Sequence, residues 1–552
     1  MDDTSPPLVI EDLSFKYRAR EEWALQHVSF SMDRGELLLL AGASGCGKTT
    51  ISRCINGLIP RSYRGEMQGS VRVNGQEVRE MGLAEVAQVV GTLLQNPDRQ
   101  IVASTVEGEV AFGPENLGLP PDEIHQRVDE VLDRLKLDHL RGRETYALSG
   151  GERQKVALAG VLAMRPSILL LDEPLASLDP AAAQEALALF RRLVDEGVTV
   201  IVVEHRVEDV LGMRPDRVMY VSKGIVEYLG PTEGLYEVVN PKEVKLPAEV
   251  VMAMARKVGK SAEVAPTPRV EPGANLVQFE DVDYAYGDGP TVLHNVNLSV
   301  RKGDVVAVLG PNGAGKSTLV KHAIGLLKPK SGRVLVEGKD TRELTVAEIA
   351  HTVGYVFQSP THMLFAPTVQ EELTFGPKNL GYDSEAITAS TARSVRALNL
   401  TGLEEYPPLS LSFGQQKRLT IACVVAMMSR ILAMDEPTAG QDFGNYTSFM
   451  NAIVKGGTNG SGSSSGGDSV ASEFDAVLFI THDLDLAVLY ASKVILLSEG
   501  SVAAEGPPED VLHDLDLLRA CHVVPTSLLK ENLRLLDKTG RFLPAENLAF
   551  VE

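Results

Sequence analysis

The sequence LSGGERQKVALAGVLAMRPSILLLDEPLASLD, residues 148–179, decides the architecture of this chain because it occurs twice. Its counterpart, LSFGQQKRLTIACVVAMMSRILAMDEPTAGQD, occupies residues 411–442. Each copy has a polar turn with glycine, an apolar helical segment, a short buried-strand pattern and two adjacent carboxylates before a proline. Asp172 and its equivalent Asp435 lie 263 positions apart. A duplication of this period in 552 residues predicts two domains of one fold.

The composition excludes several classes of protein. A formal charge of −21 argues against electrostatic capture of nucleic acid or anionic lipid, and favours a basic partner surface. The four cysteines show neither a disulfide framework nor metal-ligand spacing, which fits a reducing cytosol. The N-terminus reads acidic and polar rather than as a signal, and the longest apolar run, residues 421–428, is too short to span a bilayer. We therefore expect any membrane role to be peripheral, at the cytoplasmic face.

A glycine-rich loop with a lysine follows an apolar strand pattern in each copy. GASGCGKTT, residues 42–50, and GPNGAGKST, residues 310–318, both fit the phosphate-loop pattern between a strand and a helix. The glycines let backbone N–H groups surround phosphates, the lysine reaches the β- and γ-phosphates, and the hydroxyl after the lysine binds Mg²⁺. The predicted ATP-binding residues of the loops, with Thr49 and Ser317 as metal ligands, are Gly42, Ser44, Gly45, Gly47, Lys48, Thr49, Thr50, Gly310, Asn312, Gly313, Gly315, Lys316, Ser317 and Thr318.

Adjacent carboxylates end a strand pattern in both copies. Asp172 and Asp435 can hold a Mg²⁺-bound water. Glu173 and Glu436 can orient or deprotonate an attacking water. The pair alone could simply end a strand, but a phosphate loop precedes it in each copy, so we predict ATP and Mg²⁺ as cofactors and the two glutamates as catalytic bases.

A histidine and a glutamine also recur at strand ends. His205 and His482 each follow an apolar strand pattern, where an imidazole can touch the γ-phosphate and hold the attacking water. Gln95 and Gln358 end another strand, where the amide can contact both the metal and the water. We predict the histidines as catalytic and the glutamines as ATP and metal ligands.

A tyrosine precedes each phosphate loop. Tyr17 and Tyr286 could stack on an adenine ring, because an aromatic face suits any base. The alternative is an ordinary half-buried strand aromatic. The neighbouring loop favours the adenine role.

These motifs recur in one order twice, and over nearly the whole chain they resemble a tandem ABC-transporter ATPase. The resemblance implies an α/β fold with two P-loop nucleotide-binding domains, each with a mostly parallel core sheet, an antiparallel β subdomain and a helical signature subdomain. It implies that the domains pair within one chain, head to tail over two ATP molecules. Each signature turn would then cap the γ-phosphate held by the opposite domain. The signature residues so assigned are Ser149, Gly150, Gly151, Ser412, Gly414 and Gln415.

The second signature departs from the family pattern. Phe413 stands where the first copy has Gly150. A ring in that place could slow the site built on Lys48. Alternatively, the position points away from phosphate and tolerates bulk, and the sequence does not decide between the two.

The stretch after the first glutamine narrows the resemblance. QNPDRQIVASTVEGEVAFGPENLGL, residues 95–119, resembles the energy-coupling factor (ECF) importers. The second copy keeps the FGP-x-NLG ending but differs at Ser359, Thr361 and His362. The resemblance implies a transmembrane coupling subunit and a substrate-binding membrane subunit as partners, no nucleic acid, and a vitamin, vitamin precursor or transition-metal ion as cargo. The second copy could also be a solvated helical subdomain whose composition has drifted.

Two rival functions use the same motifs. A tandem sugar-importer ATPase tends to lose one phosphate loop, whereas both are intact here. A soluble ribosome-associated tandem ATPase joins its halves with a long charged helix, whereas this linker is short and contains proline. We predict these boundaries: first ABC domain 1–240, linker with a short helix 241–275, second ABC domain 276–527 with a Gly/Ser-rich insertion at 456–472, and tail 528–552.

Overall fold

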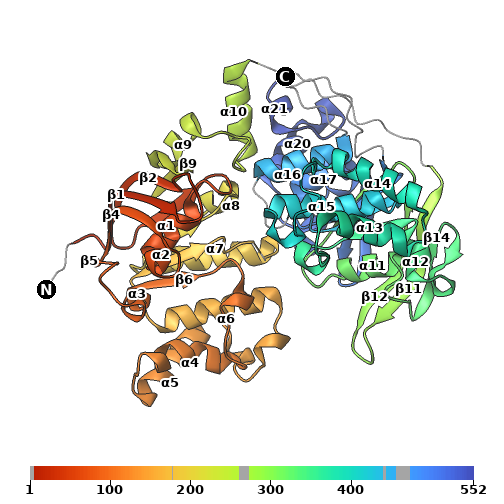
Figure 1. The fold of residues 1–552 in the computed structure, drawn as a ribbon. Coiled ribbons are helices and arrows are strands. Elements are labelled where there is room, and N and C mark those ends of the chain that lie inside the picture. The colour runs from red at the N-terminus through yellow and green to blue at the C-terminus, as the bar shows by residue number, and fades with distance from the viewer. Residues whose placement is uncertain (1–4, 177, 260–272, 439–442, 456–472, 552) are drawn as a thin grey trace. The chain divides into compact units, whose positions relative to one another are not determined.

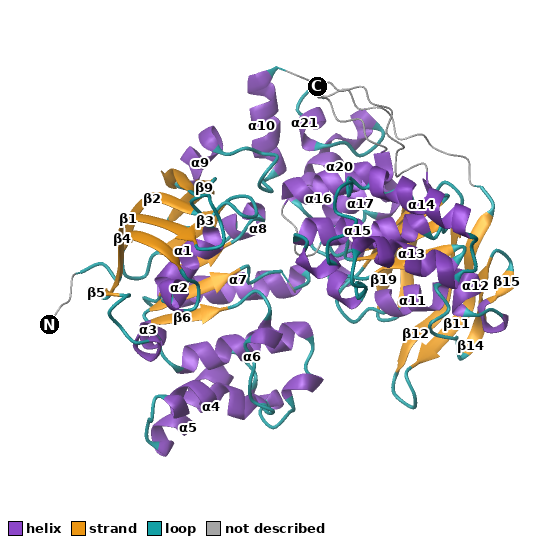
Figure 2. Cartoon of the chain, viewed as in Figure 1, coloured by secondary structure: helices purple, strands orange, loops and turns teal. Residues whose placement is uncertain are grey.

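The chain forms two compact units of the same architecture. In the computed structural model, Met1–Leu246 makes up almost all of the first unit, and the second begins at Pro247. Each unit has a six-stranded sheet, a four-stranded sheet and a group of helices (Figures 1 and 2). The residues described are 5–176, 178–259, 273–438, 443–455 and 473–551. The Gly/Ser-rich insertion, the loose part of the predicted linker and the Gly-Gln-Asp turn of the second copy lie outside them.

The six-stranded sheet of the first unit carries the strand ends that the motifs predict. Its strands pair in parallel, except that β10 runs antiparallel to β9. The central strands are short runs of Leu, Ile and Val, as expected where both faces of a sheet are covered. In spatial order the strands are β10 (Ile225–Gly230), β9 (Arg217–Ser222), β3 (Leu37–Ala41), β8 (Thr199–Val203), β7 (Ile168–Asp172) and β6 (Val90–Leu93).

The second unit repeats this sheet with the same neighbours. Its one antiparallel pair, β19 with β20, lies at the equivalent edge. In spatial order the strands are β20 (Ser501–Gly506), β19 (Lys493–Ser498), β13 (Val305–Leu309), β18 (Ala476–Ile480), β17 (Ile431–Asp435) and β16 (Val353–Val356). The predicted α/β tandem fold is confirmed.

An antiparallel sheet packs on the main sheet in each unit. In the first unit, Phe15 from this sheet joins one buried apolar cluster with Leu40 and Ile201 of the main sheet. Burying such side chains is the main favourable contribution to folding. The strands are β2 (Leu25–Met32), β1 (Leu8–Tyr17), β4 (Gly65–Val73) and β5 (Gln76–Glu77) in the first unit, and β12 (Thr291–Arg301), β11 (Asn275–Ala285), β14 (Ser331–Val336) and β15 (Lys339–Asp340) in the second.

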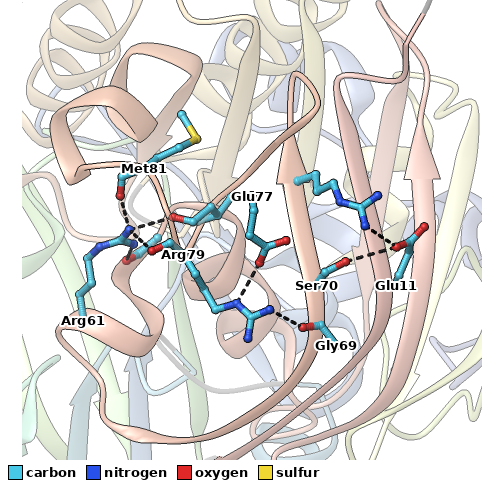
Figure 3. A network of polar contacts seen from close by, with 10 residues as sticks. Glu11, Arg61, Gly69, Ser70, Glu77, Arg79 and Met81 are labelled. Carbon is cyan, nitrogen blue, oxygen red and sulfur yellow. Dashed lines mark hydrogen bonds and ion pairs between the residues drawn. The ribbon is translucent and has the colours of Figure 1, made fainter.

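Polar contacts fix the outer edge of the first antiparallel sheet (Figure 3). The Arg61 guanidinium donates to the backbone carbonyls of Gly57 at 2.9 Å and Val78 at 2.8 Å. Arg79 donates to Glu77 and to the Gly69 carbonyl, both at 2.9 Å. The Arg61 bonds tie the turn after β5 to the helix α2, and the Arg79 bonds tie it to β5 and β4.

Helices cover the main sheets and form a separate helical group in each unit. In the first unit α4 packs on α5 and α6, and in the second α13 packs on α14 and α15. The helices of the first unit are α1 (Lys48–Ile55), α2 (Leu58–Arg61), α3 (Leu83–Val89), α4 (Val106–Asn116), α5 (Pro121–Arg134), α6 (Gly150–Ala163), α7 (Pro180–Asp195), α8 (Val207–Leu211) and α9 (Thr232–Val238). Those of the second are α10 (Ala248–Val258), α11 (Lys316–Ala323), α12 (Val346–Ala350), α13 (Val369–Asn379), α14 (Ser384–Ala397), α15 (Phe413–Ala426), α16 (Phe443–Met450), α17 (Leu484–Tyr490), α18 (Pro508–Val511), α19 (Leu515–Ala520), α20 (Ser527–Thr539) and α21 (Ala545–Leu548).

The short helix predicted within the linker, α10, packs against the C-terminal helices. The backbone N–H of Ala248 in α10 donates to the Ser527 hydroxyl at 2.8 Å, and Arg256 donates to the Ala549 carbonyl at 2.8 Å. Asn532 is fully buried in α20 and its amide donates to the Leu543 carbonyl at 2.9 Å. Residues far apart in the sequence thus form one small layer within the second unit (Figure 1).

Candidate active sites

The phosphate loop of the first unit joins β3 to α1. Gly42, Gly45 and Gly47 all have positive φ, which favours glycine. A Cβ at Gly42 would lie 2.3 Å from the Val221 carbonyl oxygen, so this position admits no side chain. The buried ammonium of Lys48 donates to the carbonyls of Gly42 at 2.6 Å and Ala43 at 2.9 Å. The loop therefore curls around its own lysine, with its N–H groups at the start of a helix.

The second loop, between β13 and α11, has the same geometry. Lys316 donates to the carbonyls of Gly310 and Pro311, both at 2.8 Å. Gly310, Gly313 and Gly315 again have positive φ. Both loops thus place a buried cation and backbone donors where phosphate oxygens can replace the carbonyls.

The two predicted bases share an unusual backbone conformation. Glu173 has φ of 47° and Glu436 has φ of 45°, both left-handed and without a glycine. This conformation costs about 1–2 kcal/mol for an L-residue. Strain of this kind concentrates at functional sites, where the surrounding fold holds it in place. In each unit it turns the glutamate out of the end of its strand, β7 or β17.

Strand register brings each histidine to its glutamate. Asp172 pairs with Val203 across β7 and β8, and Asp435 pairs with Ile480 across β17 and β18. The residues that follow are therefore neighbours. His482 Nδ1 lies 3.0 Å from Glu436 Oε1. In the first unit His205 Nδ1 lies 3.8 Å from Glu173 Oε1.

The strand-end glutamines differ between the two units. Gln95 Nε2 donates to Glu173 Oε2 at 2.6 Å. Gln358 is exposed at the equivalent place, and the Glu436 Oε2 atom is buried without a hydrogen-bond partner among the described residues. The glutamate is therefore held by an amide in the first site and by a histidine in the second.

Oxygen donors suited to Mg²⁺ come together in the second unit. Ser317 Oγ donates to Asp435 Oδ2 at 3.0 Å, and the Tyr355 hydroxyl donates to the same oxygen at 2.9 Å. Hydroxyl and carboxylate oxygens are the ligands that Mg²⁺ prefers. Burial raises the pKa of Asp435, while the Tyr355 hydrogen bond works to lower it. A bound cation would favour the charged form, so these residues fit a magnesium ion.

The first unit has a more crowded set of buried acids. Burial raises the pKa of Asp172 to about 6, and the Glu173 charge adds to the shift. Burial raises the pKa of Glu204 to about 7, which the His205 charge partly opposes. Burial works to lower the pKa of His205, but the Glu173 and Glu204 carboxylates outweigh it and the pKa lies above its usual value. Glu173 and Glu204 therefore favour a protonated His205.

Both signature serines begin a helix, as the sequence predicts. Ser149 caps α6: its hydroxyl accepts from the Glu152 N–H at 3.3 Å, and its own N–H donates to the Glu152 carboxylate at 2.7 Å. Ser412 forms the same capping box with Gln415 at the start of α15. Gly150, Gly151 and Gly414 occupy the first turns. Helix N-termini of this kind suit an anion.

The Phe413 ring lies on the surface. Its side chain is 41% exposed at the first position of α15. Nothing in the described part of the second unit explains the departure from glycine. Which phosphate site each signature serves stays a prediction.

The predicted adenine-stacking tyrosines lie beside the phosphate-loop helices. The Tyr17 hydroxyl is 3.1 Å from the Thr50 hydroxyl and also accepts from Arg53 at 3.1 Å. The Tyr286 hydroxyl is likewise 3.1 Å from the Thr318 hydroxyl. Each tyrosine hydroxyl therefore contacts the threonine two residues after the loop lysine. Stacking of the ring on a base stays a prediction.

Three residues near the carboxylates did not emerge from the sequence. Glu204 is buried and accepts from the Leu175 N–H at 3.3 Å, next to His205. Tyr355 stands on β16, where the first copy has Thr92. Lys417 is buried in α15, where burial lowers its pKa and the Asp435 and Glu436 charges work to raise it. Comparing the two copies position by position would have found the last two.

The two units, with their phosphate loops, strand-end carboxylates and helix-capping serines, define a pair of P-loop ATPase domains. The family model described as "ABC transporter" matches residues 25–176 and 293–439. The chain belongs to the ABC transporter family, and it is an ATPase whose domains bind ATP.

Two relatives match almost the whole of this chain. A "Putative ABC transporter ATP-binding protein" of Methanosarcina acetivorans is 35% identical, over 95% of this chain and 89% of that protein. A protein of the same description from Bacillus cereus is 33% identical, over 95% of each chain. Among solved structures, cbiO1 from Clostridium perfringens, described as part of the ABC transporter complex cbiONQ, is 30% identical with a TM-score of 0.39, covering 48% of this chain and 97% of that one.

Proposed function

We propose that this chain is the ATP-hydrolysing motor of an ECF-type importer, and that it energises uptake of a vitamin, vitamin precursor or transition-metal ion through transmembrane partners. Each ATP would lie between the phosphate loop of one unit and the signature helix of the other. Glu173 and Glu436 would act as bases, and His205 and His482 would hold the attacking water. Mg²⁺ would bind at Thr49 and Asp172 with Gln95, and equivalently in the second unit, and would neutralise phosphate charge.

The observation that supports a membrane partner is an exposed apolar surface on a fixed loop and helix after each strand-end glutamine. The Glu372 carboxylate is 4% exposed and accepts from the N–H groups of Phe365 and Ala366, both at 2.8 Å. This fixes the loop so that Phe365 stays 63% exposed beside Phe375 of α13, which is 50% exposed. The two rings meet edge to face with centroids 4.8 Å apart. A buried carboxylate that fixes a loop with an exposed aromatic ring is typical of a surface that binds another protein.

The first unit repeats this surface. Glu109 is 6% exposed and accepts from the N–H groups of Val102 and Ala103, both at 2.8 Å. Val102 and Phe112 are 63% and 46% exposed. We assign the two surfaces to cytoplasmic segments of a membrane-spanning partner. No helix in the described part of the chain is long and apolar enough to cross a membrane.

The test is purification of the full chain from membranes with its partners, followed by ATPase and uptake assays on the reconstituted complex. We expect a multi-spanning subunit and a small substrate-binding subunit, and ATP-dependent uptake of a vitamin, a vitamin precursor, Co²⁺ or Ni²⁺. Phe365→Asp with Phe375→Asp should release the complex while the isolated chain keeps its ATPase activity. Recovery with ribosomes in high salt, or with a sugar-transport channel, would contradict the proposal.

A further inference from the structure

Lys417 is a lysine in a place where lysines are rarely found. It lies within α15, five residues after Ser412, with a side chain only 1% exposed. Its ammonium is buried without a hydrogen-bond partner among the described residues. Burying an unpaired ammonium is costly, so a lysine here calls for an explanation beyond packing.

The equivalent residue of the first unit shows what this position contacts. Gln154 in α6 is buried, and its amide donates to the carbonyl of Pro174, the residue after Glu173. This position of the signature helix therefore faces the turn that carries the catalytic carboxylate. In the second copy a cation replaces the neutral amide.

The charges around Lys417 come from that same turn. Burial lowers the pKa of Lys417 to about 8, while the Asp435 and Glu436 charges work to raise it. Two acids at the end of β17 are thus within electrostatic reach of a buried cation.

The Glu436 carboxylate has an oxygen that this cation could hold. Glu436 Oε1 lies 3.0 Å from His482, but Oε2 is buried without a partner among the described residues. In the first unit the corresponding oxygen of Glu173 accepts from Gln95. The second unit thus has a buried carboxylate oxygen and a buried ammonium close to one turn, and neither has a hydrogen-bond partner among the described residues. Each is costly alone.

We propose that Lys417 is a positioning residue for the second ATPase site, and that its ammonium holds the Glu436 carboxylate through Oε2 in the role that Gln95 has for Glu173. The two groups are not hydrogen-bonded in this structure, so the pairing requires a rotamer change at one of them. The proposal rests on the proposed role of Glu436 as base.

The test compares Lys417→Met, which keeps the size without the charge, with Glu436→Gln in the full chain. We expect Lys417→Met to lower kcat. The logarithm of its fold-loss should be at least half of that for Glu436→Gln. The KM for ATP should stay within about twofold, because the charges that act on Lys417 are those of Asp435 and Glu436 at the end of β17. Lys417→Gln, which copies the first unit, should lose turnover like Lys417→Met. Lys155→Met, an exposed lysine of α6, is the matched control and should leave turnover unchanged.

The outcomes separate the two hypotheses. If Glu436→Gln loses turnover and Lys417→Met does not, the positioning role is wrong and Glu436 keeps its own. If Glu436→Gln keeps its turnover, both the role of Glu436 as base and the positioning role of Lys417 are wrong. A rise in KM or a lower unfolding temperature in Lys417→Met would mean that the lysine only packs, which also overturns the proposal.

Discussion

Replacing Lys417 by methionine should stabilise the protein, because its buried ammonium opposes folding at neutral pH. The side chain is 1% exposed, and burial lowers its pKa from 10.5 to about 8. A pKa lowered to about 8 corresponds to about 3 kcal/mol between the charged and neutral forms. Methionine has a similar length and no charge, so most of this cost should disappear.

The pH dependence follows from the direction of the shift. Between pH 8 and about 10.5 the unfolded chain carries a proton on Lys417 that the folded chain lacks. Wild-type stability attributable to this group therefore rises with pH across that window. The methionine variant has no such proton, so its advantage should be fully present below pH 8 and shrink toward pH 10.5.

Scanning calorimetry of the full chain is the suitable assay, because two units can unfold in separate transitions. At about 2–4 °C per kcal/mol for a unit of this size, a gain of about 2 kcal/mol should raise the transition of the second unit by about 4–8 °C at pH 7. Lys155→Met should change stability by less than about 0.5 kcal/mol. A lowered transition, or an advantage that stays constant from pH 7 to 10, would refute the reasoning.

Further predictions concern the sites and the docking surface. Glu173→Gln and Glu436→Gln should each lower kcat by about 10²- to 10⁴-fold if the affected base limits turnover, with ATP binding retained, as measured by steady-state hydrolysis and equilibrium binding. Ser412→Ala should lose the cap of α15 at about 1 kcal/mol, seen in thermal unfolding, and should also lower turnover; unchanged turnover would argue against the signature role. Glu372→Ala should cost about 2–3 kcal/mol, because two buried N–H groups lose their acceptor, and should weaken binding to the membrane partner by freeing the Phe365 loop; an intact complex would count against the docking surface.

Much of each site could be predicted from the sequence because its parts are local patterns. A glycine loop between a strand and a helix fixes the position of Lys48, and a serine three residues before Glu152 marks the start of α6. Parallel strands end at one edge, so carboxylates and histidines that follow strands were expected to meet. The structure brings His482 to Glu436 in this way.

What escaped prediction depends on tertiary packing. Lys417 lies in a polar-looking Gln-Gln-Lys-Arg segment, and only the packing of α15 in the second unit buries it. Tyr355 reads as an ordinary strand aromatic until the pairing of β16 with β17 places its hydroxyl on Asp435. The contact of α10 with the C-terminal helices joins segments about 280 residues apart, which no local pattern signals.

The central claim is that each ATP is held by the phosphate loop of one unit and the signature serine of the other. Disulfide formation between Ser149→Cys and Asn312→Cys tests it directly, since the four native cysteines are all buried. With ATP present and Mg²⁺ withheld, we expect rapid cross-linking within one chain, and none between Ser412→Cys and Asn312→Cys. No ATP-dependent cross-link in the first pair, or an equal one in the second, would contradict the claim.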